Sequence, residues 1–360
     1  IAVRLLNPGI PVIARARTPS VAANMASFGT DHIINPFARF AEYLGLAVAS
    51  PERFRLIEML TGLPETPLPE PHRPPAGRWI LCGYGRFGHL LATHLQPAGI
   101  DLTIIDPGCT DCVSPPTIRG NGTEAVTLLQ AGIEGASGII AGSDNDVNNL
   151  SIAMTASELK PSLFVVTRQN HSVNNPLFAA YNADFTMVPG RIVAQECIAI
   201  LTTPLLAAFL DLLRERDETW SGALVVRLQA LCDGRTPALW AVKLNIAGAQ
   251  GAYRALMQGQ RIALGDILRD GTDRSQALPA ATLLIRRGKE LILLPPDEFL
   301  LAAGDELLLA SSLSARRNLE LTLHNPNELD YVLTGSEVSG SWLWERFMRS
   351  GRPGAPAGEP

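Results

Sequence analysis

The sequence lacks several features that define common functional classes. It has no lysine- or arginine-rich run and a formal net charge of −5, which argues against nucleic acid as its main partner. It has 5 cysteines, and its one C-x-x-C pair, Cys109 and Cys112, has no second pair to complete a zinc site. We therefore expect no metal site and a reducing compartment.

No stretch predicts a membrane span. The most apolar stretch, residues 192–213, contains Gln195, Glu196, Pro204 and Asp211, and is better explained as two buried or interface helices. There is no signal peptide, and the chain begins at Ile1 rather than at a methionine. We expect a soluble fragment of a longer protein.

What the chain does contain is a glycine-rich turn between two apolar runs. Residues 80–82 enter the turn Gly83-Tyr84-Gly85-Arg86-Phe87-Gly88, a helical pattern follows, and the next apolar run ends at Asp106. This G-x-G-x-x-G context predicts a dinucleotide-binding unit. The first glycine would make the tight turn, the second would admit a pyrophosphate, and the third would let the helix pack on the strand.

The acid at the end of the second run indicates the ligand. Asp106 would accept hydrogen bonds from a ribose diol and would repel a 2′-phosphate. NAD(H) or an adenine nucleotide is therefore favoured over NADP. A fold that keeps the turn around an empty pocket is the alternative.

Residues 77–190 alternate between strand and helix patterns, which predicts an α/β fold with a Rossmann-like, doubly wound, mostly parallel sheet. The second crossover, residues 107–116, contains three prolines and is expected to be a loop. A ligand would bind at the carboxyl ends of the strands, where Gly83, Asp106, Asn121 and the Ser143-Asp144 turn fall. The expected strands are 79–82, 102–106, a short one ending near 119, 138–141, 163–168 and 185–188. The expected helices are 87–95, 123–131, 147–159 and 173–181.

Residues 1–62 resemble residues 152–213, and from Val12 onward the two copies match without a gap at an offset of 153. Val12-Ile13-Ala14-Arg15 falls on Val165-Val166-Thr167-Arg168, and Pro36 and Pro51 fall on Pro189 and Pro204. We therefore expect residues 1–62 to be the C-terminal half of a first, truncated domain of the same kind.

The remaining boundaries follow from changes in composition. Residues 63–76 are a proline-rich, extended linker, and the second nucleotide-binding domain with its long helices would span 77–216. A small α+β domain is expected at 219–318, and a partly disordered tail at 319–360. The expected strands of the small domain are 224–228, a hairpin within 282–294, and 306–310. In the tail, Trp342, Trp344 and Phe347 could dock as an amphipathic segment.

In this order, the motifs resemble the RCK (regulator of potassium conductance) family, with its TrkA-N and TrkA-C domains. The match is carried by the glycine turn, Ile105-Asp106, Gly120-Asn121-Gly122-Thr123 and residues 144–150. The match continues in the last domain, where residues 285–307 resemble the regulatory C-subdomain of the family. In all, the resemblance covers about residues 1–318.

The resemblance implies a regulatory module that binds NAD(H), ATP, ADP or AMP without chemistry on the ligand. Binding would change the angle between paired domains in a homo-oligomeric gating ring, and so act on a potassium channel pore at the cytoplasmic face of the plasma membrane. By position, the implied phosphate-binding residues are Gly83, Tyr84, Gly85, Arg86, Phe87 and Gly88. Asp106 would hold a ribose. Asn121 stands where members often have an acid near the adenine. Arg168 would reach phosphate or form a salt bridge beneath the crevice.

Two nucleotide-binding units are joined by a short linker and followed by one C-subdomain. Peripheral transporter subunits of the family usually have a C-subdomain after each unit, so the resemblance favours two tandem units fused to a channel pore. The alternatives are a peripheral subunit of a Trk/Ktr-type transporter and the tail of a cation/proton antiporter. A nicotinamide-dependent oxidoreductase is more distant, because residues 219–318 contain no histidine. His89, His94 and His171 are interpreted as structural.

Overall fold

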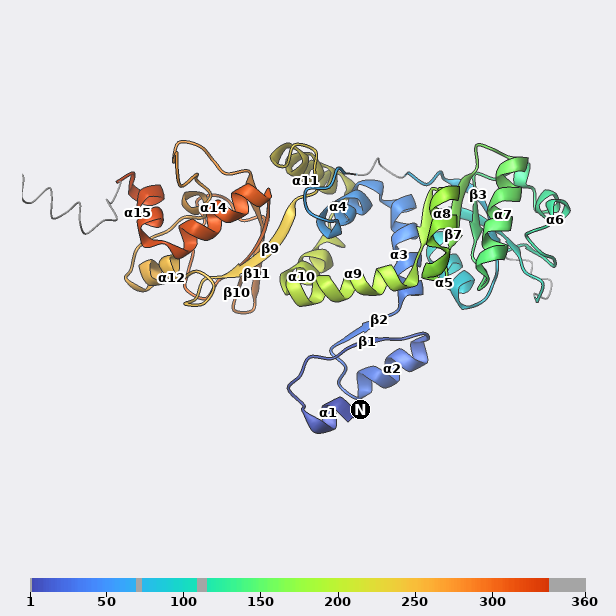
Figure 1. Ribbon diagram of the computed structural model, residues 1–360, viewed down its shortest axis with the longest axis horizontal. Helices are drawn as coiled ribbons and strands as arrows, with labels where there is room; N and C mark the ends of the chain where they lie inside the picture. Colours follow the sequence, from blue (N-terminus) through green and yellow to red (C-terminus); the bar gives the residue numbers. More distant parts are fainter. Residues whose placement is uncertain (1, 69–72, 109–114, 337–360) are drawn as a thin grey trace, which may run out of the picture. The chain divides into compact units, whose positions relative to one another are not determined.

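The computed structural model describes residues 2–68, 73–108 and 115–336, which form two units (Figure 1). The first unit contains Ile1–Thr61, Pro69–Thr202 and Leu213–Val225. The second contains Gly62–Leu68, Thr203–Leu212 and Val226–Pro360.

A parallel sheet of 6 strands, in the order β5-β4-β3-β6-β7-β8, forms the centre of the first unit. All five strand pairs are parallel, and the order reverses between β3 and β6. The predicted doubly wound, Rossmann-like sheet is therefore confirmed. Its strands are β3 (Gly77–Cys82), β4 (Ile100–Ile105), β5 (Thr117–Ile118), β6 (Gly138–Ala141), β7 (Phe164–Arg168) and β8 (Phe185–Met187).

Helices cover both faces of this sheet, because alternate strand residues are apolar on both sides. Trp79 and Leu81 pack with Phe40 and Leu44 of α3 (Pro36–Ala49) and with Leu91 of α5 (Arg86–Leu95). On the other face the strands pack against α6 and α7 (Figure 1). The helices that follow the turn are α5 (Arg86–Leu95), α6 (Ala125–Gln130), α7 (Asp146–Leu159) and α8 (Asn175–Tyr181), with short 3-10 turns at Ile133–Gly135 and Ser172–Asn174.

The N-terminal elements reproduce the last third of this sheet domain. Strand β1 pairs with β2 in parallel with Ile13 opposite His32, as β7 pairs with β8 with Val166 opposite Phe185. The elements are α1 (Ala2–Leu6), β1 (Ile13–Arg15), α2 (Pro19–Ser27), β2 (His32–Ile34), α3 (Pro36–Ala49) and α4 (Pro51–Thr61). Their counterparts after β8 are α9 (Pro189–Thr202) and α10 (Pro204–Leu213).

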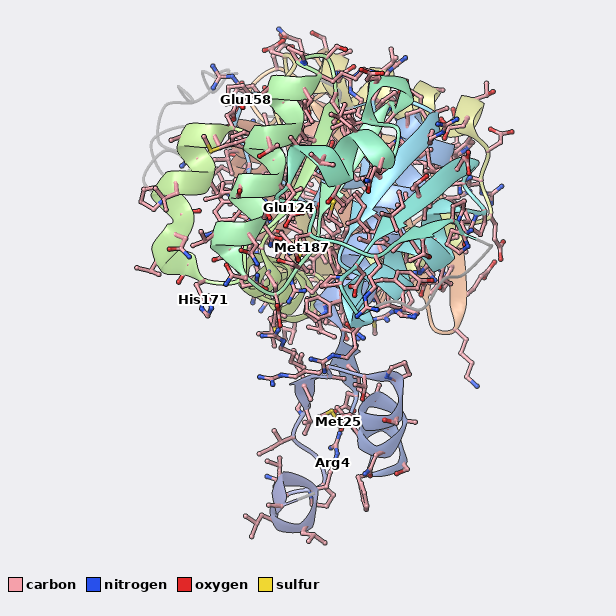
Figure 2. All side chains as sticks on the ribbon, turned by 90° about the vertical axis from the view of Figure 1, so that its right-hand side faces the viewer. Arg4, Met25, Glu124, Glu158, His171 and Met187 are labelled. Carbon is pink, nitrogen blue, oxygen red and sulfur yellow. The ribbon has the colours of Figure 1, made fainter. Side chains whose placement is uncertain are left out.

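One hydrogen bond recurs at the same place in both copies of the repeat. The amide of Val12 donates to a carboxylate oxygen of Asp31 at 2.6 Å, and the amide of Val165 donates to Asp184 at 2.7 Å. In the N-terminal copy, Arg4 also forms an ion pair with Asp31 and donates to the carbonyl of Gly29 at 2.7 Å (Figure 2). The repeat found in the sequence is therefore a repeat of elements, strand register and side-chain contacts.

The second unit is built on a 4-stranded antiparallel sheet, in the order β11-β10-β12-β9. The ion pair of Arg287 with the buried Asp305 joins β10 to the turn before β12, at 2.7 Å. The strands are β9 (Ala238–Lys243), β10 (Ala280–Arg287), β11 (Glu290–Leu293) and β12 (Glu306–Ser311). Helix α11 (Glu218–Leu231) begins in the first unit and continues into the second at Val226. The other helices of the second unit are α12 (Gln250–Met257), α13 (Leu264–Ile267), α14 (Leu313–His324) and α15 (Pro326–Thr334).

The strand predicted at 224–228 is wrong, since these residues lie inside helix α11. Two adjacent valines suggested a strand, but the buried residues are Leu224, Val225 and Leu228, and Val226 is exposed. That spacing follows the helical period rather than strand alternation. The sequence analysis also missed β9, which pairs with β12.

Two boundaries also differ from the predictions. The linker does not begin as a free extended segment, because Glu65 donates its amide to the Thr236 carbonyl at 2.8 Å and Thr236 donates to Thr66 at 2.9 Å. The tail does not begin at residue 319, because α14 continues to His324 and α15 places Leu329 and Val332 in the core of the second unit. Apolar residues at helical spacing in 319–334 account for this packing.

Some predictions fall on residues that the structure does not describe. These are the Cys109 and Cys112 pair and the possible docking of Trp342, Trp344 and Phe347. Within the described ranges no single helix is long and apolar enough to cross a membrane, and only α9 and α10 taken together reach that length and composition.

Candidate functional site

A cavity of about 580 Å³ opens at the carboxyl ends of β3, β4 and β6, where the strand order reverses. Small-molecule and cofactor sites have volumes of roughly 300–1,000 Å³. Seven of the nine predicted site residues line it, namely Gly83, Gly85, Arg86, Phe87, Asp106, Asn121 and Arg168. Tyr84 and Gly88 belong to the same turn but do not line the cavity.

The three glycines of the turn have different surroundings. Gly83 has a φ of 99°, in the left-handed region that favours glycine. A Cβ at Gly88 would overlap the carbonyl oxygen of Gly83, so α5 approaches β3 too closely for any side chain. A Cβ at Gly85 would meet nothing within 4 Å. The protein itself therefore requires the first and third glycines, and the space at Gly85 is open to a ligand.

Helix α5 begins at this turn without a capping side chain. Gly85 is its N-cap and supplies no side-chain hydrogen bond to the first turn. The first amides of the helix, with the positive end of its dipole, therefore face the cavity, where Arg86 and Phe87 line the wall. Such a helix start is suited to an anionic group.

Asp106 closes the turn as well as facing the cavity. Its two carboxylate oxygens accept hydrogen bonds from the amide of Tyr84 at 2.6 Å and from the amide of Gly108 at 2.8 Å. Each oxygen keeps a free lone pair, because a carboxylate can accept about four hydrogen bonds. Asp106 thus has a structural role that the sequence did not indicate, and retains capacity for a ligand hydroxyl.

The loop after β5 forms another wall. A Cβ at Gly122 would stand 2.6 Å from the sulfur of Cys82, which explains the glycine in this position. Asn121 is exposed and donates to Glu124 through a long hydrogen bond of 3.4 Å. Burial raises the pKa of the Cys82 thiol to about 12, so it stays protonated at neutral pH and is no nucleophile.

Arg168, at the end of β7, does not form the salt bridge that was one of its two predicted roles. Within the described ranges no carboxylate lies within ion-pair distance of Arg168, although the charges of Asp144 and Asp146 act on it, and its Nη1 donates to the carbonyl of Gly142 at 3.3 Å. Its guanidinium lies 4.6 Å from the ring centroid of Phe37 and 5.4 Å from that of Phe87. Its buried Nε has no hydrogen-bond partner.

Burial lowers the pKa of Arg168, the charges of Asp144 and Asp146 oppose this, and nearby Arg86 adds to the decrease. Arginine nevertheless stays charged in proteins. The site therefore holds a partly desolvated cation with an unused donor.

Phe37 is a wall residue that the sequence analysis missed. It belongs to α3 of the N-terminal repeat, yet it lines the cavity and its ring lies 5.4 Å from that of Phe87. The oxygen of the Asn35 side chain accepts from the Phe37 amide at 3.1 Å and fixes this start of α3. No local pattern signals that a residue so distant in sequence reaches the turn.

Asn149 was also missed, and it positions two sides of the cavity. Its amide nitrogen donates to the carbonyls of Ser143 at 3.0 Å and Arg168 at 2.7 Å, and its oxygen accepts from the Ser143 amide at 2.9 Å. Asn149 is fully buried. The ends of β6 and β7 are therefore tied together by one side chain.

Asp146, at the start of α7, holds the loop that follows Arg168. Its carboxylate accepts from the amides of Asn170 at 2.6 Å and His171 at 3.0 Å and from the side chain of Asn174 at 2.7 Å. Burial disfavours its charge, but the hydrogen bond from the Asn170 amide and those beside it outweigh this and lower the pKa of Asp146. His171 itself is exposed and lines no part of the cavity (Figure 2).

The strand order of the sheet, the glycine turn and the cavity at the strand ends define a Rossmann-type domain. Residues 79–189 match the family model of the TrkA-N domain. The chain thus contains a TrkA-N domain, and the predicted resemblance is confirmed for this part.

Two relatives have names that bear on function. The chain is 26% identical over 147 residues to "Potassium channel protein 1" of Methanocaldococcus jannaschii, covering 39% of this chain and 44% of the relative. It is 28% identical over 134 residues to a "Trk system potassium uptake protein TrkA homolog" of Methanothermobacter thermautotrophicus, covering 36% of this chain and 62% of the relative. The chain thus spans less than two thirds of each relative.

A solved structure described as "GsuK channel bound to NAD" is similar over 87% of this chain and 62% of that chain, at 17% identity and a TM-score of 0.43. At this score the likeness has no bearing on what this chain binds.

The unequal surroundings of the glycines lead to a prediction. Gly88→Ala should lower the free energy of unfolding by about 1–3 kcal/mol or more, because the new methyl overlaps backbone. Gly85→Ala should change it by less than about 1 kcal/mol, since φ is −76° and the methyl stands in open space. Urea unfolding of both variants measures the difference, and equal losses would contradict the roles given to these glycines.

A second prediction concerns Asp146. Because its folded-state pKa lies below the unfolded value of about 3.9, its contribution to stability is present above that pH and is lost as the pH falls below it. Asp146→Asn should therefore flatten the decline in unfolding free energy between about pH 5 and pH 2.5. The exposed Asp101→Asn is the control, and a decline as steep as in the wild type would refute the prediction.

Proposed function

We propose that the chain is a nucleotide-sensing regulatory module of a potassium channel, with its ligand at the Gly83–Gly88 turn. The observation that carries the proposal is the cavity at the reversal of strand order, lined by the helix start at Gly85, by Asp106 and by Arg168. Ligands of open parallel sheets bind at this place.

The wall chemistry supports a phosphorylated, ribose-bearing ligand. The uncapped start of α5 and the guanidiniums of Arg86 and Arg168 suit phosphates, and the free lone pairs of Asp106 suit a ribose diol. NAD(H) is the first candidate, and ATP, ADP or AMP are the others. Tyr84 and Gly88 act on this ligand indirectly, by shaping the turn.

We propose that the ligand is bound without turnover. No histidine lines the cavity among the described residues, and the one thiol, Cys82, is kept protonated by burial. A dehydrogenase needs a general acid or base near its substrate. NADH fluorescence should therefore report binding but no oxidation with hydroxy acids or aldehydes.

The proposed partner is a potassium channel pore, acted on by a homo-oligomer at the cytoplasmic face of the membrane. Support comes from the TrkA-N match and from the relative named as a potassium channel protein. The relative named as a TrkA homologue favours a second candidate, a peripheral subunit of a Trk-type uptake system. We propose residues 1–62, 77–216 and 219–318 as the domains that transmit the signal.

Asp106→Asn should weaken binding of ADP by about 1.5–3 kcal/mol, the value of a charged hydrogen bond. Because Asp106 also accepts bonds from the turn, the ribose contact is isolated with 2′,3′-dideoxy-ADP. The wild type should lose affinity for the dideoxy ligand, and the variant should not discriminate between the two. Calorimetric titration measures this, with Asp101→Asn as control, and equal discrimination in both proteins would exclude the ribose contact.

Channel regulation is tested by recording from the full-length protein in membranes. The open probability should change when NAD⁺, NADH, ATP or ADP is added to the cytoplasmic face, because a ligand shifts a gate only if it binds two states unequally. The Asp106→Asn variant should need more ligand for the same change. An open probability that ignores all four nucleotides would refute the gating role.

A further inference from the structure

A second, smaller cavity of about 180 Å³ adjoins the nucleotide cavity in the first unit. Four arginines line it: Arg15, Arg17, Arg86 and Arg168. Phe37, Arg86 and Arg168 line both cavities. No aspartate or glutamate belongs to the wall of the smaller cavity, so its character is strongly cationic.

The four arginines come from both copies of the repeat. Arg15 is the last residue of β1, and Arg168 is the last residue of β7, its counterpart in the repeat. Arg17 follows β1 by two residues, and Arg86 begins α5. Helix α3 starts beside them at Pro36, so the positive end of its dipole adds to the same field.

Among the described residues, the opposite charges that act on this group come from Asp144 and Asp146, which act on Arg168 from outside the smaller cavity. None of the four arginines forms an ion pair with a described residue, although the same part of the chain pairs Arg4, Arg39 and Arg73 with acids. Like charges that line one small space repel each other, and an anion bound between them would reduce this repulsion.

An unused donor points to the same conclusion. The Nε of Arg168 is buried without a hydrogen-bond partner, and buried polar atoms left unpaired are rare unless water or an ion satisfies them. Arginine binds phosphate oxygens in pairs of parallel hydrogen bonds, and a phosphoryl group offers several such oxygens and up to two charges.

We propose that the smaller cavity binds a phosphoryl group between the two copies of the repeat. The group is either the terminal phosphate of a nucleotide on the glycine turn, in which case this inference rests on the proposed function, or free inorganic phosphate. Arg15 and Arg17 hold it from the N-terminal copy, and Arg86 and Arg168 from the TrkA-N domain. The bound group ties β1 to the end of β7, so the number of phosphates on a nucleotide determines how firmly the N-terminal copy is held.

The test uses the double variant Arg15→Gln/Arg17→Gln in the full chain. Both side chains are exposed, so the variant should fold like the wild type. The control, Arg78→Gln/Arg191→Gln, removes the same number of charges from exposed positions outside both cavities. ATP, AMP and inorganic phosphate are titrated into each protein by calorimetry at constant ionic strength.

If the terminal phosphate of a nucleotide is the ligand, the double variant should lose about tenfold or more in ATP affinity but less than about fivefold in AMP affinity. If free phosphate is the ligand, the variant should lose inorganic phosphate binding and keep its affinity for both nucleotides. The control should match the wild type in each titration. Either pattern supports the proposal.

Equal weakening of ATP and AMP with no effect on inorganic phosphate, affinities like those of the control, or a wild type that binds neither ATP nor phosphate would each overturn it. The outcome is separable from that of the proposed function. If nucleotides bind equally to wild type and variant and neither protein binds inorganic phosphate, the glycine-turn site is supported and the arginine cavity is not. Phosphate that binds while no nucleotide does leaves the arginine cavity standing alone.

Discussion

The close approach of α5 to β3 is the constraint on which the site depends. It requires a bare Cα at Gly88, since any side chain there would overlap the carbonyl of Gly83. It brings the open helix start to the end of the strand, where Asp106 fixes the turn through the amide of Tyr84. This contact sets the position of the cavity, and Phe37 and Arg168 line the cavity beside the turn.

The fold of the TrkA-N domain could be predicted from sequence because its signals are local. Apolar runs, the glycine turn and Asp106 lie within about one strand–helix–strand unit of each other, and parallel strands with crossover helices leave few arrangements. The repeat could also be predicted from the sequence, because the matching residues of the two copies align without a gap. Predictions failed where packing overrode local preference, as in residues 224–228, whose valines favour a strand in isolation but whose buried residues follow a helix.

The site was predicted in part for the same reason. The residues of the turn, Asp106, Asn121 and Arg168 stand at strand ends, where sheet topology alone brings side chains together. Phe37 and Asn149 could not be found this way, because their roles depend on a helix from the other copy of the repeat and on a buried hydrogen-bond network. The second bond of Asp106, to Gly108, likewise needs the folded loop.

Phe37 has a consequence for engineering. A chimera that transplants residues 77–216 into another host would carry the floor of the nucleotide cavity but leave behind one of its aromatic walls. Such a graft would need its own substitute for the ring that Phe37 places beside Phe87. Swap experiments on this chain are therefore better cut before Asn35, so that the cap of α3 travels with the site.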